Sequence, residues 1–169
     1  MTNTFFIGDL HFGHKNIIKF DGIRDIRHFD TIEEHDAELV RRWNKVIGRK
    51  DIVWVLGDFC FGKKNLEIAG QLNGIKKLIL GNHDTYQSAD YLKYFHKLYG
   101  AVEYRGNILT HIPVHTDQFD RFKFNIHGHL HTNIINDPRY ICVSAEQIGL
   151  APIHEEDLNN TRKTIDNIS

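Results

Sequence analysis

Carboxylate, amide and imidazole side chains gather in five short segments of the chain. The segments are, in order, Asp9-Leu10-His11, Gly57-Asp58, Gly81-Asn82-His83-Asp84, Thr110-His111 and Gly128-His129-Leu130-His131. Oxygen and nitrogen donors without thiolate suit borderline divalent metals such as Mn²⁺, Fe²⁺ or Zn²⁺. Two carboxylates, one amide and four imidazoles of this set exceed the ligands that one tetrahedral ion needs, so the segments favour a two-metal site.

Histidine is abundant in this chain and cysteine is scarce. There are 12 histidines and two cysteines among 169 residues. Cys60 and Cys142 are too far apart for a C-x-x-C zinc motif and too few for a disulfide framework, so we expect both to be small core residues. The excess of imidazole therefore calls for a chemical reason, and metal binding supplies one.

Apolar runs precede the first three polar segments and are the elements that must position them. They span residues 4–7, 52–56 and 78–80. Each run is typical of a buried strand that ends in a site loop. Ligands of open α/β sheets bind beyond the carboxyl ends of the strands, so distant segments are expected to converge there. We expect the glycines before Asp58, Asn82 and His129 to let the chain turn sharply.

Helical spacing is clearest between the first two strands. Residues 31–47 carry apolar side chains at helical spacing, and Thr31 with Glu34 forms a capping box, which predicts a helix. Further helices are expected over about 64–72 and 88–99, the latter from one apolar face. After Gly100 the pattern predicts mainly strands. They cover 102–104 and 108–110, joined as a hairpin, and then 124–127 and 140–143.

Length and composition, with 41% hydrophobic and 25% charged residues, predict a single domain over residues 1–169. Only the tail after about Arg162 is polar enough to fray. The sequence shows neither a spanning apolar run nor a signal-peptide pattern in residues 1–20, which predicts a cytoplasmic protein without a membrane partner. The formal net charge of −1 provides no basic footprint for a nucleic-acid polymer.

The five segments, in this order, resemble the signature blocks of the calcineurin-like metallophosphoesterase superfamily. The resemblance spans Asp9 to His131, and the opening Asp9-Leu10-His11-Phe12-Gly13-His14 is similar to a subgroup of small, uncapped predicted phosphoesterases of bacteria and phages. One such block is weak evidence because it occurs by chance. Five blocks in the same order, each at a strand end, make chance agreement improbable. The resemblance implies an α/β fold in which two mixed sheets pack as a sandwich flanked by helices.

The resemblance also implies a dinuclear metal centre and assigns its ligands. One ion would be held by Asp9, His11 and His131, the other by Asn82, His111 and His129, and Asp58 would bridge them. Mn²⁺ is the expected metal, with Fe²⁺, Zn²⁺ and Ni²⁺ as alternatives. A bridging water would become hydroxide near neutral pH and attack phosphorus in line.

His83 stands in the Gly-Asn-His position that supplies the catalytic histidine of the family, where it would stabilise the phosphoryl group and protonate the leaving oxygen. One departure concerns its partner. Many relatives carry a second acid shortly after the bridging aspartate, whereas this block runs Gly57-Asp58-Phe59-Cys60-Phe61-Gly62. Without an acid at Phe61, another group must orient His83, with Asp84 as a candidate, or its imidazole keeps a lower pKa.

Four residues outside the ligand set are candidate substrate contacts: His14, Lys15, Arg24 and Arg27. The alternative is that these basic residues are ordinary surface charges and that His14 starts a short helix. Five further histidines are expected to be solvated or to lie in loops. They are His28, His35, His96, His115 and His154. Trp43 and Trp54 follow the apolar periodicity and are expected in the core.

The predicted function is metal-dependent hydrolysis of a small or nucleotide-like phosphoester, with a phosphodiesterase favoured over a phosphomonoesterase. A non-catalytic, protein-binding scaffold of the same fold is the rival from another class. Such a scaffold should have lost His83 or several ligands, and here every position is filled. A nuclease is disfavoured by the balanced charge. The oligomeric state is left open by the sequence.

Overall fold

The computed structural model describes residues 2–158, so the tail expected to fray after Arg162 lies outside the described residues. A five-stranded sheet has the order β4-β3-β2-β1-β9 and a four-stranded sheet the order β5-β6-β7-β8. The strands of the first sheet are β1 (Thr4–Ile7), β2 (Ile52–Leu56), β3 (Ile75–Ile79), β4 (Lys97–Tyr99) and β9 (Ile153–His154). Those of the second are β5 (Ala101–Tyr104), β6 (Asn107–Thr110), β7 (Asn125–His127) and β8 (Tyr140–Cys142).

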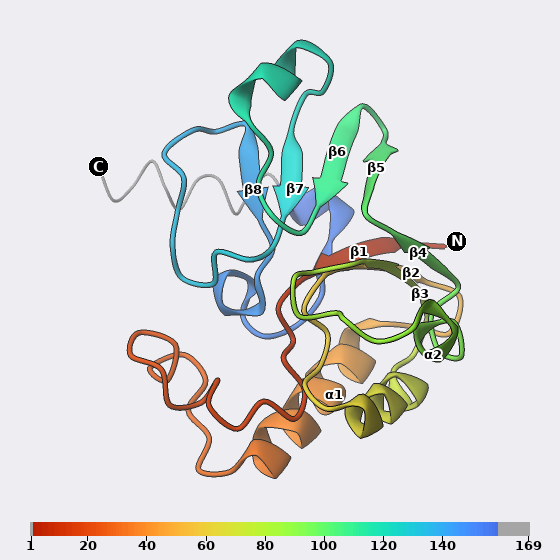
Figure 1. The fold of residues 1–169 in the computed structure, drawn as a ribbon, viewed down its shortest axis with the longest axis vertical. Coiled ribbons are helices and arrows are strands. Elements are labelled where there is room, and N and C mark those ends of the chain that lie inside the picture. Colours follow the sequence, from red (N-terminus) through yellow and green to blue (C-terminus); the bar gives the residue numbers. More distant parts are fainter. Residues whose placement is uncertain (1, 159–169) are drawn as a thin grey trace.

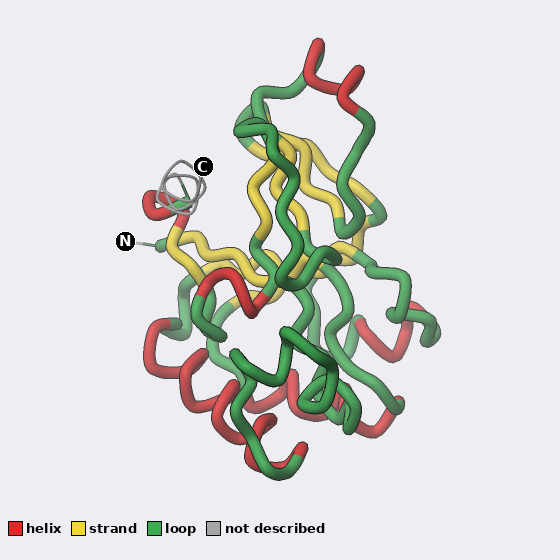
Figure 2. The backbone as a smooth tube through the Cα atoms, turned by 90° about the vertical axis from the view of Figure 1, so that its left-hand side faces the viewer, coloured by secondary structure: helices red, strands yellow, loops and turns green. Residues whose placement is uncertain are grey.

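The two sheets form separate layers, and both mix parallel with antiparallel pairs. Figures 1 and 2 show helix α1 (Ile32–Val46) and the 3-10 helix η1 (Lys63–Gln71) on the side of the five-stranded sheet away from the other sheet. The remaining helical segments are short. They are α2 (Ser88–Tyr91), η2 (Thr116–Asp120), η3 (Ala145–Ile148) and η4 (Glu155–Asp157). The expected α/β sandwich of two mixed sheets with helices is therefore confirmed.

Alternation along β1 explains the two layers of the core. Phe6 packs between the sheets with residues such as Leu109 and Ile126. Its neighbours Phe5 and Ile7 point the other way and pack with the helices. Because both faces of the strand are covered, it reads in the sequence as an unbroken apolar run. Burial on both faces fixes the register of β1 and with it the position of the residues that follow.

Helix α1 confirms the Thr31 half of the predicted capping box. The Thr31 hydroxyl accepts a hydrogen bond from the Glu34 backbone N–H at 3.2 Å, which satisfies one free donor of the first turn. Leu39 and Trp43 of the apolar face are buried against the sheet. The Trp43 indole donates to the Asn73 carbonyl at 3.0 Å, so its polar edge is satisfied as well.

The prediction of a helix over 88–99 is wrong beyond the first turn. Helix α2 ends at Tyr91, and residues 97–99 form strand β4, which pairs in parallel with β3. Leu92, which helical spacing over 88–99 would put on the apolar face with Tyr91 and Phe95, is 53% exposed. Strand β4 instead forms backbone hydrogen bonds with the edge of β3. This tertiary pairing outweighs the weak helical periodicity of the local sequence.

Parallel pairing brings several polar segments to one edge. Strands β1, β2 and β3 are parallel neighbours, as are β6, β7 and β8. The sheets meet at this edge through a parallel bridge between Gly8 and Ser144, with the Gly8 N–H bonded to the Val143 carbonyl at 2.7 Å. The loops after both sets of strands therefore face one another. Within residues 2–158, no helix has the length and apolar character needed to cross a bilayer.

Candidate metal centre

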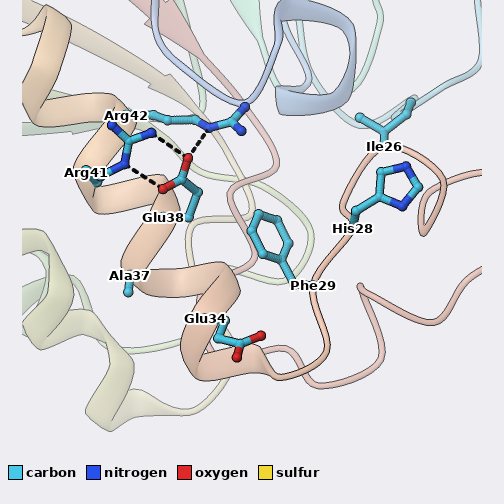
Figure 3. Close-up of a pocket in the computed structure, with 8 residues that line it drawn as sticks. All are labelled: Ile26, His28, Phe29, Glu34, Ala37, Glu38, Arg41 and Arg42. Atoms are coloured by element: carbon cyan, nitrogen blue, oxygen red, sulfur yellow. Dashed lines mark hydrogen bonds and ion pairs between the residues drawn. The ribbon is translucent and has the colours of Figure 1, made fainter.

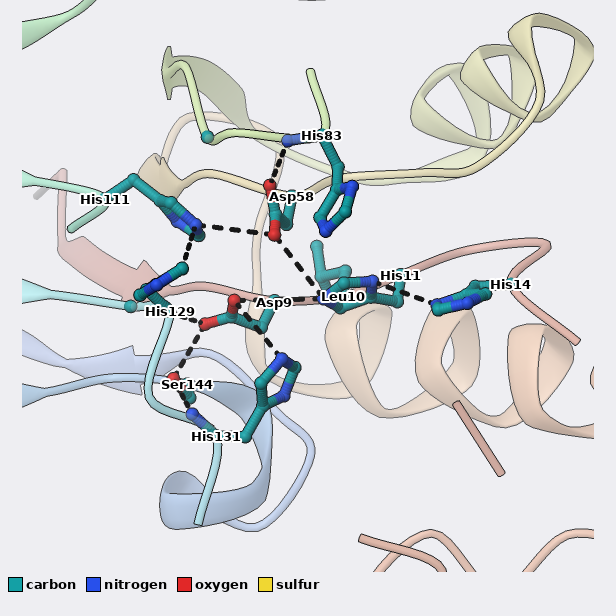
Figure 4. Close-up of polar contacts among 12 residues, drawn as sticks. Asp9, Leu10, His11, His14, Asp58, His83, His111, His129, His131 and Ser144 are labelled. Atoms are coloured by element: carbon teal, nitrogen blue, oxygen red, sulfur yellow. Dashed lines mark hydrogen bonds and ion pairs between the residues drawn. The ribbon is translucent and has the colours of Figure 1, made fainter. Parts of the chain in front are cut away.

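The first group of possible ligands comprises Asp9, His11 and His131, whose donor atoms all lie within 4.8 Å of one another. Asp9 Oδ1 is 3.9 Å from His11 Nε2 and 4.0 Å from His131 Nε2. These separations are too long for hydrogen bonds. They match the spacing of donors that each lie about 2.1 Å from a shared ion. Figure 4 shows the three side chains turned toward one point.

The second group comprises Asp58, His111 and His129. Nε2 of His111 lies 3.4 Å from Asp58 Oδ2 and 3.2 Å from His129 Nδ1. The same nitrogen is 3.0 Å from Oδ1 of Asn82, so the amide expected as a ligand also reaches this group. All seven residues that the sequence nominated as ligands are thus brought together by the fold.

Asp58 stands between the two groups. Its Oδ2 is 3.7 Å from His11 Nε2 in the first group and 3.4 Å from His111 Nε2 in the second. Its Oδ1 is occupied elsewhere, since it accepts the His83 backbone N–H at 2.9 Å. One oxygen of Asp58 therefore faces both groups while the other anchors the loop that carries His83 (Figure 4).

The backbone at the ligands is unusual. Five of the seven non-glycine residues with positive φ in the described part of the chain are candidate ligands. They are Asp9 (56°), His11 (53°), Asp58 (53°), His129 (70°) and His131 (51°). The left-handed region is unfavourable for side chains with a Cβ and concentrates at functional sites. The fold thus accepts strain at these positions to aim the side chains inward.

The glycines before the ligands have a reason that differs in part from the expected one. Gly57 does have positive φ (86°), as a sharp turn requires. Gly81 and Gly128 are instead required by space, because a Cβ there would collide with the carboxylates of Asp58 and Asp9, respectively. A Cβ at Gly57 would also strike the His111 ring. All three glycines let the ligand loops approach closely.

Unpaired buried atoms support a cation in the first group. Asp9 Oδ2 accepts the Ser144 hydroxyl at 2.7 Å and the His129 backbone N–H at 2.8 Å. In contrast, Asp9 Oδ1 and His11 Nε2 are buried without a hydrogen-bond partner. Buried polar atoms in native proteins are normally satisfied. Both unpaired atoms face the shared point of the group, where a metal ion would satisfy them.

The carboxylates at the second group attract positive charge. Burial acts to raise the pKa of Asp58, but the hydrogen bond and charge of His111 lower it to about 2. Burial acts to lower the pKa of His111, while its hydrogen bond to Asp58 and the charge of Asp9 raise it to about 9. Nδ1 of His111 lies 2.7 Å from the Leu56 carbonyl and donates to it, which leaves Nε2 directed at the group. The donor set therefore fits borderline divalent ions.

His83 is exposed and lies beside both groups. Its ring centroid is 4.7 Å from that of Phe61 and 6.0 Å from that of His11. Asp84 does not orient this ring, because its carboxylate accepts the backbone N–H groups of Asp58, Phe59 and Gly81 at 2.8–3.1 Å. The His83 ring is instead held by its backbone anchor and by packing against Phe61.

His14 lies at the edge of the ligand groups. Its ring stacks on Phe61 with centroids 3.9 Å apart and planes at 14°. Nδ1 of His14 is 3.3 Å from Nδ1 of His11. Burial, followed by the charges of His11 and His83, lowers the pKa of His14 to about 4. A neutral His14 therefore contacts the site, whereas Lys15 and Arg24 are exposed on the segment that follows.

Arg27 and His35 are not where the sequence interpretation placed them. Arg27, expected at the substrate, is 0% exposed and pairs with Glu146 at 2.7 Å. His35, expected to be solvated, is equally buried and lies 2.7 Å from an Arg27 nitrogen. Their burial is the physical reason for both corrections, since neither side chain reaches solvent. The other expectations for histidines hold for His28, His96 and His115, which are exposed.

Sequence reasoning missed two residues of the site, Ser144 and Glu146. Ser144 binds Asp9 as described above, and Glu146 Oε1 accepts a hydrogen bond from His131 Nδ1 at 3.1 Å. Both follow the strand-like run at 140–143. The reasoning that nominated polar residues after the earlier strands also applied here, so the signal was present.

A separate hollow lies between helix α1 and the segment before it (Figure 3). It is lined by Ile26, His28, Phe29, Glu34, Ala37, Glu38, Arg41 and Arg42. Three of its charged side chains pair with one another, with Glu38 Oε atoms 2.6 Å from Arg41 and 2.8 Å from Arg42. The lining contains none of the candidate ligands, so this hollow is distinct from the site.

Comparison with known proteins agrees with this geometry. The sequence model of the calcineurin-like phosphoesterases matches residues 2–166. The Gene 66 protein of Mycobacterium phage L5 is 35% identical over 173 residues, covering 80% of each chain. An uncharacterized protein of Methanocaldococcus jannaschii is 33% identical over 166 residues, covering 90% of this chain and 87% of that one. A solved structure of a protein of unknown function from Aquifex aeolicus superposes with a TM-score of 0.70 at 26% identity, covering 95% of this chain and 99% of that one.

Proposed function

Because the chain belongs to the calcineurin-like phosphoesterase family and is therefore a phosphoester hydrolase, we propose that it is a two-metal phosphodiesterase. The observation that carries the proposal is the shared oxygen Oδ2 of Asp58, within 3.7 Å of one donor group and 3.4 Å of the other. A bridging carboxylate offsets the repulsion between two neighbouring cations. We propose that the chain acts as one domain, since loops of both sheets supply the ligands.

Two sets of residues would hold the metals, and Asp58 would be shared by both sets. Asp9, His11 and His131 would hold one ion, and Asn82, His111 and His129 the other. Mn²⁺ is the proposed metal, with Fe²⁺, Zn²⁺ and Ni²⁺ as alternatives suited to the same donors. A bound pair of divalent ions supplies positive charge to a phosphoryl oxygen and makes water more acidic.

His83 is the proposed catalytic side chain. It is exposed at the mouth of the ligand groups, and its backbone N–H is fixed by Asp58 Oδ1. From there the imidazole would donate a proton to the leaving oxygen of the ester. His14, Lys15 and Arg24 are proposed to contact the substrate, since the segment that carries them adjoins His11.

The rival functions are a phosphomonoesterase and a non-catalytic scaffold. A scaffold has no need to keep a complete ligand set with five strained backbone positions. A polymeric nucleic acid is disfavoured as substrate by the net charge of −1. The proposal is therefore a small or nucleotide-like phosphodiester as substrate, in the cytoplasm.

Substrate preference gives the first test. A monoester dianion is best served by extra positive groups around the phosphate, whereas a diester monoanion needs little beyond two metals and an acid. The burial of Arg27 removes one such group, and Arg24 already lies 3.5 Å from Asp21. We expect kcat/KM for bis(p-nitrophenyl) phosphate to exceed that for p-nitrophenyl phosphate in Mn²⁺ at one pH.

The two substrates share a leaving group, so its chemistry largely cancels in the comparison. A clear preference for the monoester would replace the diesterase assignment with the phosphomonoesterase. Lys15 and Arg24 would then be the first residues to examine as a phosphate clamp, because both are exposed on the segment that follows His14.

A further inference from the structure

Arg27 is a buried cation with a complete set of partners. Its Nε donates to Glu146 Oε1 at 2.7 Å, and its Nη1 lies 2.7 Å from His35 Nε2. The same guanidinium donates to the backbone carbonyls of Asp9 at 2.5 Å and Leu10 at 3.0 Å. A buried charge is costly unless it is paired and hydrogen-bonded. The fold meets this requirement with groups that belong to, or contact, the first ligand group.

Glu146 connects this cation to a candidate ligand. Its Oε1 accepts both the Arg27 Nε–H and the His131 Nδ1–H, the latter at 3.1 Å. The side chain is 6% exposed and lies on η3. A neutral ring that donates from Nδ1 to a carboxylate presents Nε2 as an acceptor. That nitrogen of His131 is the atom directed toward Asp9.

The second ligand group is supported differently. His111 donates from Nδ1 to a neutral backbone carbonyl, that of Leu56. A carboxylate raises the basicity of a ligating imidazole more than a neutral carbonyl does. The ion pair of Arg27 and Glu146 therefore supports the first ligand group, because Glu146 bonds to His131 and Arg27 bonds to the Asp9 carbonyl.

We propose that Arg27 and Glu146 are positioning residues that set the metal affinity of the Asp9, His11 and His131 group, by fixing the His131 ring and the backbone of the Asp9 loop. The inference rests on the two-metal part of the proposed function. Arg27 also follows the segment that carries His14, Lys15 and Arg24, and its bonds to the Asp9 and Leu10 carbonyls fix the two ends of that segment to each other. The candidate substrate contacts are thereby tied to the same metal position.

Glu146→Gln is the test variant, because the amide keeps the shape and an oxygen acceptor while removing the charge. The metal-free protein is titrated with Mn²⁺, and the two dissociation constants are measured by calorimetry and by the EPR signal of free Mn²⁺. We expect one constant to weaken by roughly 10- to 100-fold, as is usual for an outer partner of a metal-bound histidine. The other constant should stay within about twofold, since its ligands keep their own partners.

Reference variants identify the affected position. The weakened constant should be the one lost in His131→Ala and kept in His129→Ala. Glu38→Gln is the matched control, because Glu38 forms ion pairs with Arg41 and Arg42 away from the ligands, and both of its constants should equal those of the wild type. Arg27→Lys, which keeps the charge but not the planar set of donors, should weaken the same constant. It also serves as the second variant if Glu146→Gln folds poorly by circular dichroism.

Two results would overturn the inference: wild-type constants in both variants, or an equal loss at both positions that follows a lower melting temperature. The proposed function is tested separately. A wild-type protein that binds two ions but hydrolyses no phosphodiester would remove the phosphodiesterase proposal and leave the metal-affinity result standing.

Discussion

A His83→Ala variant should keep both metal ions and lose roughly 10²- to 10⁴-fold in kcat, the usual contribution of a general acid. The metals are retained because the His83 side chain belongs to neither ligand group. The loop should also keep its place, since the contact with Asp58 is made by the His83 backbone. Metal content and turnover are measured on the same preparation.

The loss should depend on the leaving group of the ester. An alkoxide needs the proton from His83 far more than p-nitrophenolate does, so the variant should be most impaired on alkyl esters. His96→Ala is the control, because this histidine is exposed and its backbone N–H donates to the Lys76 carbonyl. Near-normal kcat of His83→Ala on a poor leaving group would show that the acid role is wrong.

The orientation of His83 illustrates a departure that the sequence raised and could not resolve. The sequence lacked an acid after Asp58 and offered Asp84 as a substitute. In the structure, Asp84 holds three backbone N–H groups of the ligand loops, while Phe61 packs against His83 and His14. The Phe61 ring thus lies where the family pattern leads one to expect a second carboxylate. Ring packing of this kind leaves no spacing signal in a single sequence.

The ligand edge was predictable because each segment has two independent signals. An apolar run marks a buried strand, and the polar residues after it mark a loop beyond its carboxyl end. Parallel pairing of β1, β2 and β3 then makes the loops meet. Strand β4 had only one signal, an apolar periodicity that fits a helix equally well. Its pairing with β3 depends on contacts that local sequence does not contain.

Arg27 shows the limit of reading charge from sequence. A lone arginine in a polar segment is normally exposed, and its burial depends on partners up to 119 positions away, such as Glu146. Composition cannot reveal such a pair. Ser144 and Glu146 were more accessible, because they follow a predicted strand just as Asp58 does.

Asp58→Asn should lower the occupancy of both metal positions, because one oxygen of Asp58 serves both ligand groups. The pKa of Asp58 is lowered to about 2, so the carboxylate is charged at any pH used for assay and the substitution removes a full negative charge. Two cations close together would then lose the group that offsets their repulsion. The loss should exceed the roughly 10- to 100-fold expected for an outer partner of a ligand.

Elemental analysis after reconstitution with Mn²⁺ measures this directly. The wild type should approach two ions per chain, since its donors form two groups, and Asp58→Asn should fall well below one at the same free Mn²⁺ concentration. His129→Ala is the informative comparison, because His129 belongs to one group and its loss should spare the ion of the other. One ion bound at full occupancy in Asp58→Asn would mean that a group holds its metal without this carboxylate, and Asp58 would then be an ordinary ligand of the second position instead of the bridge.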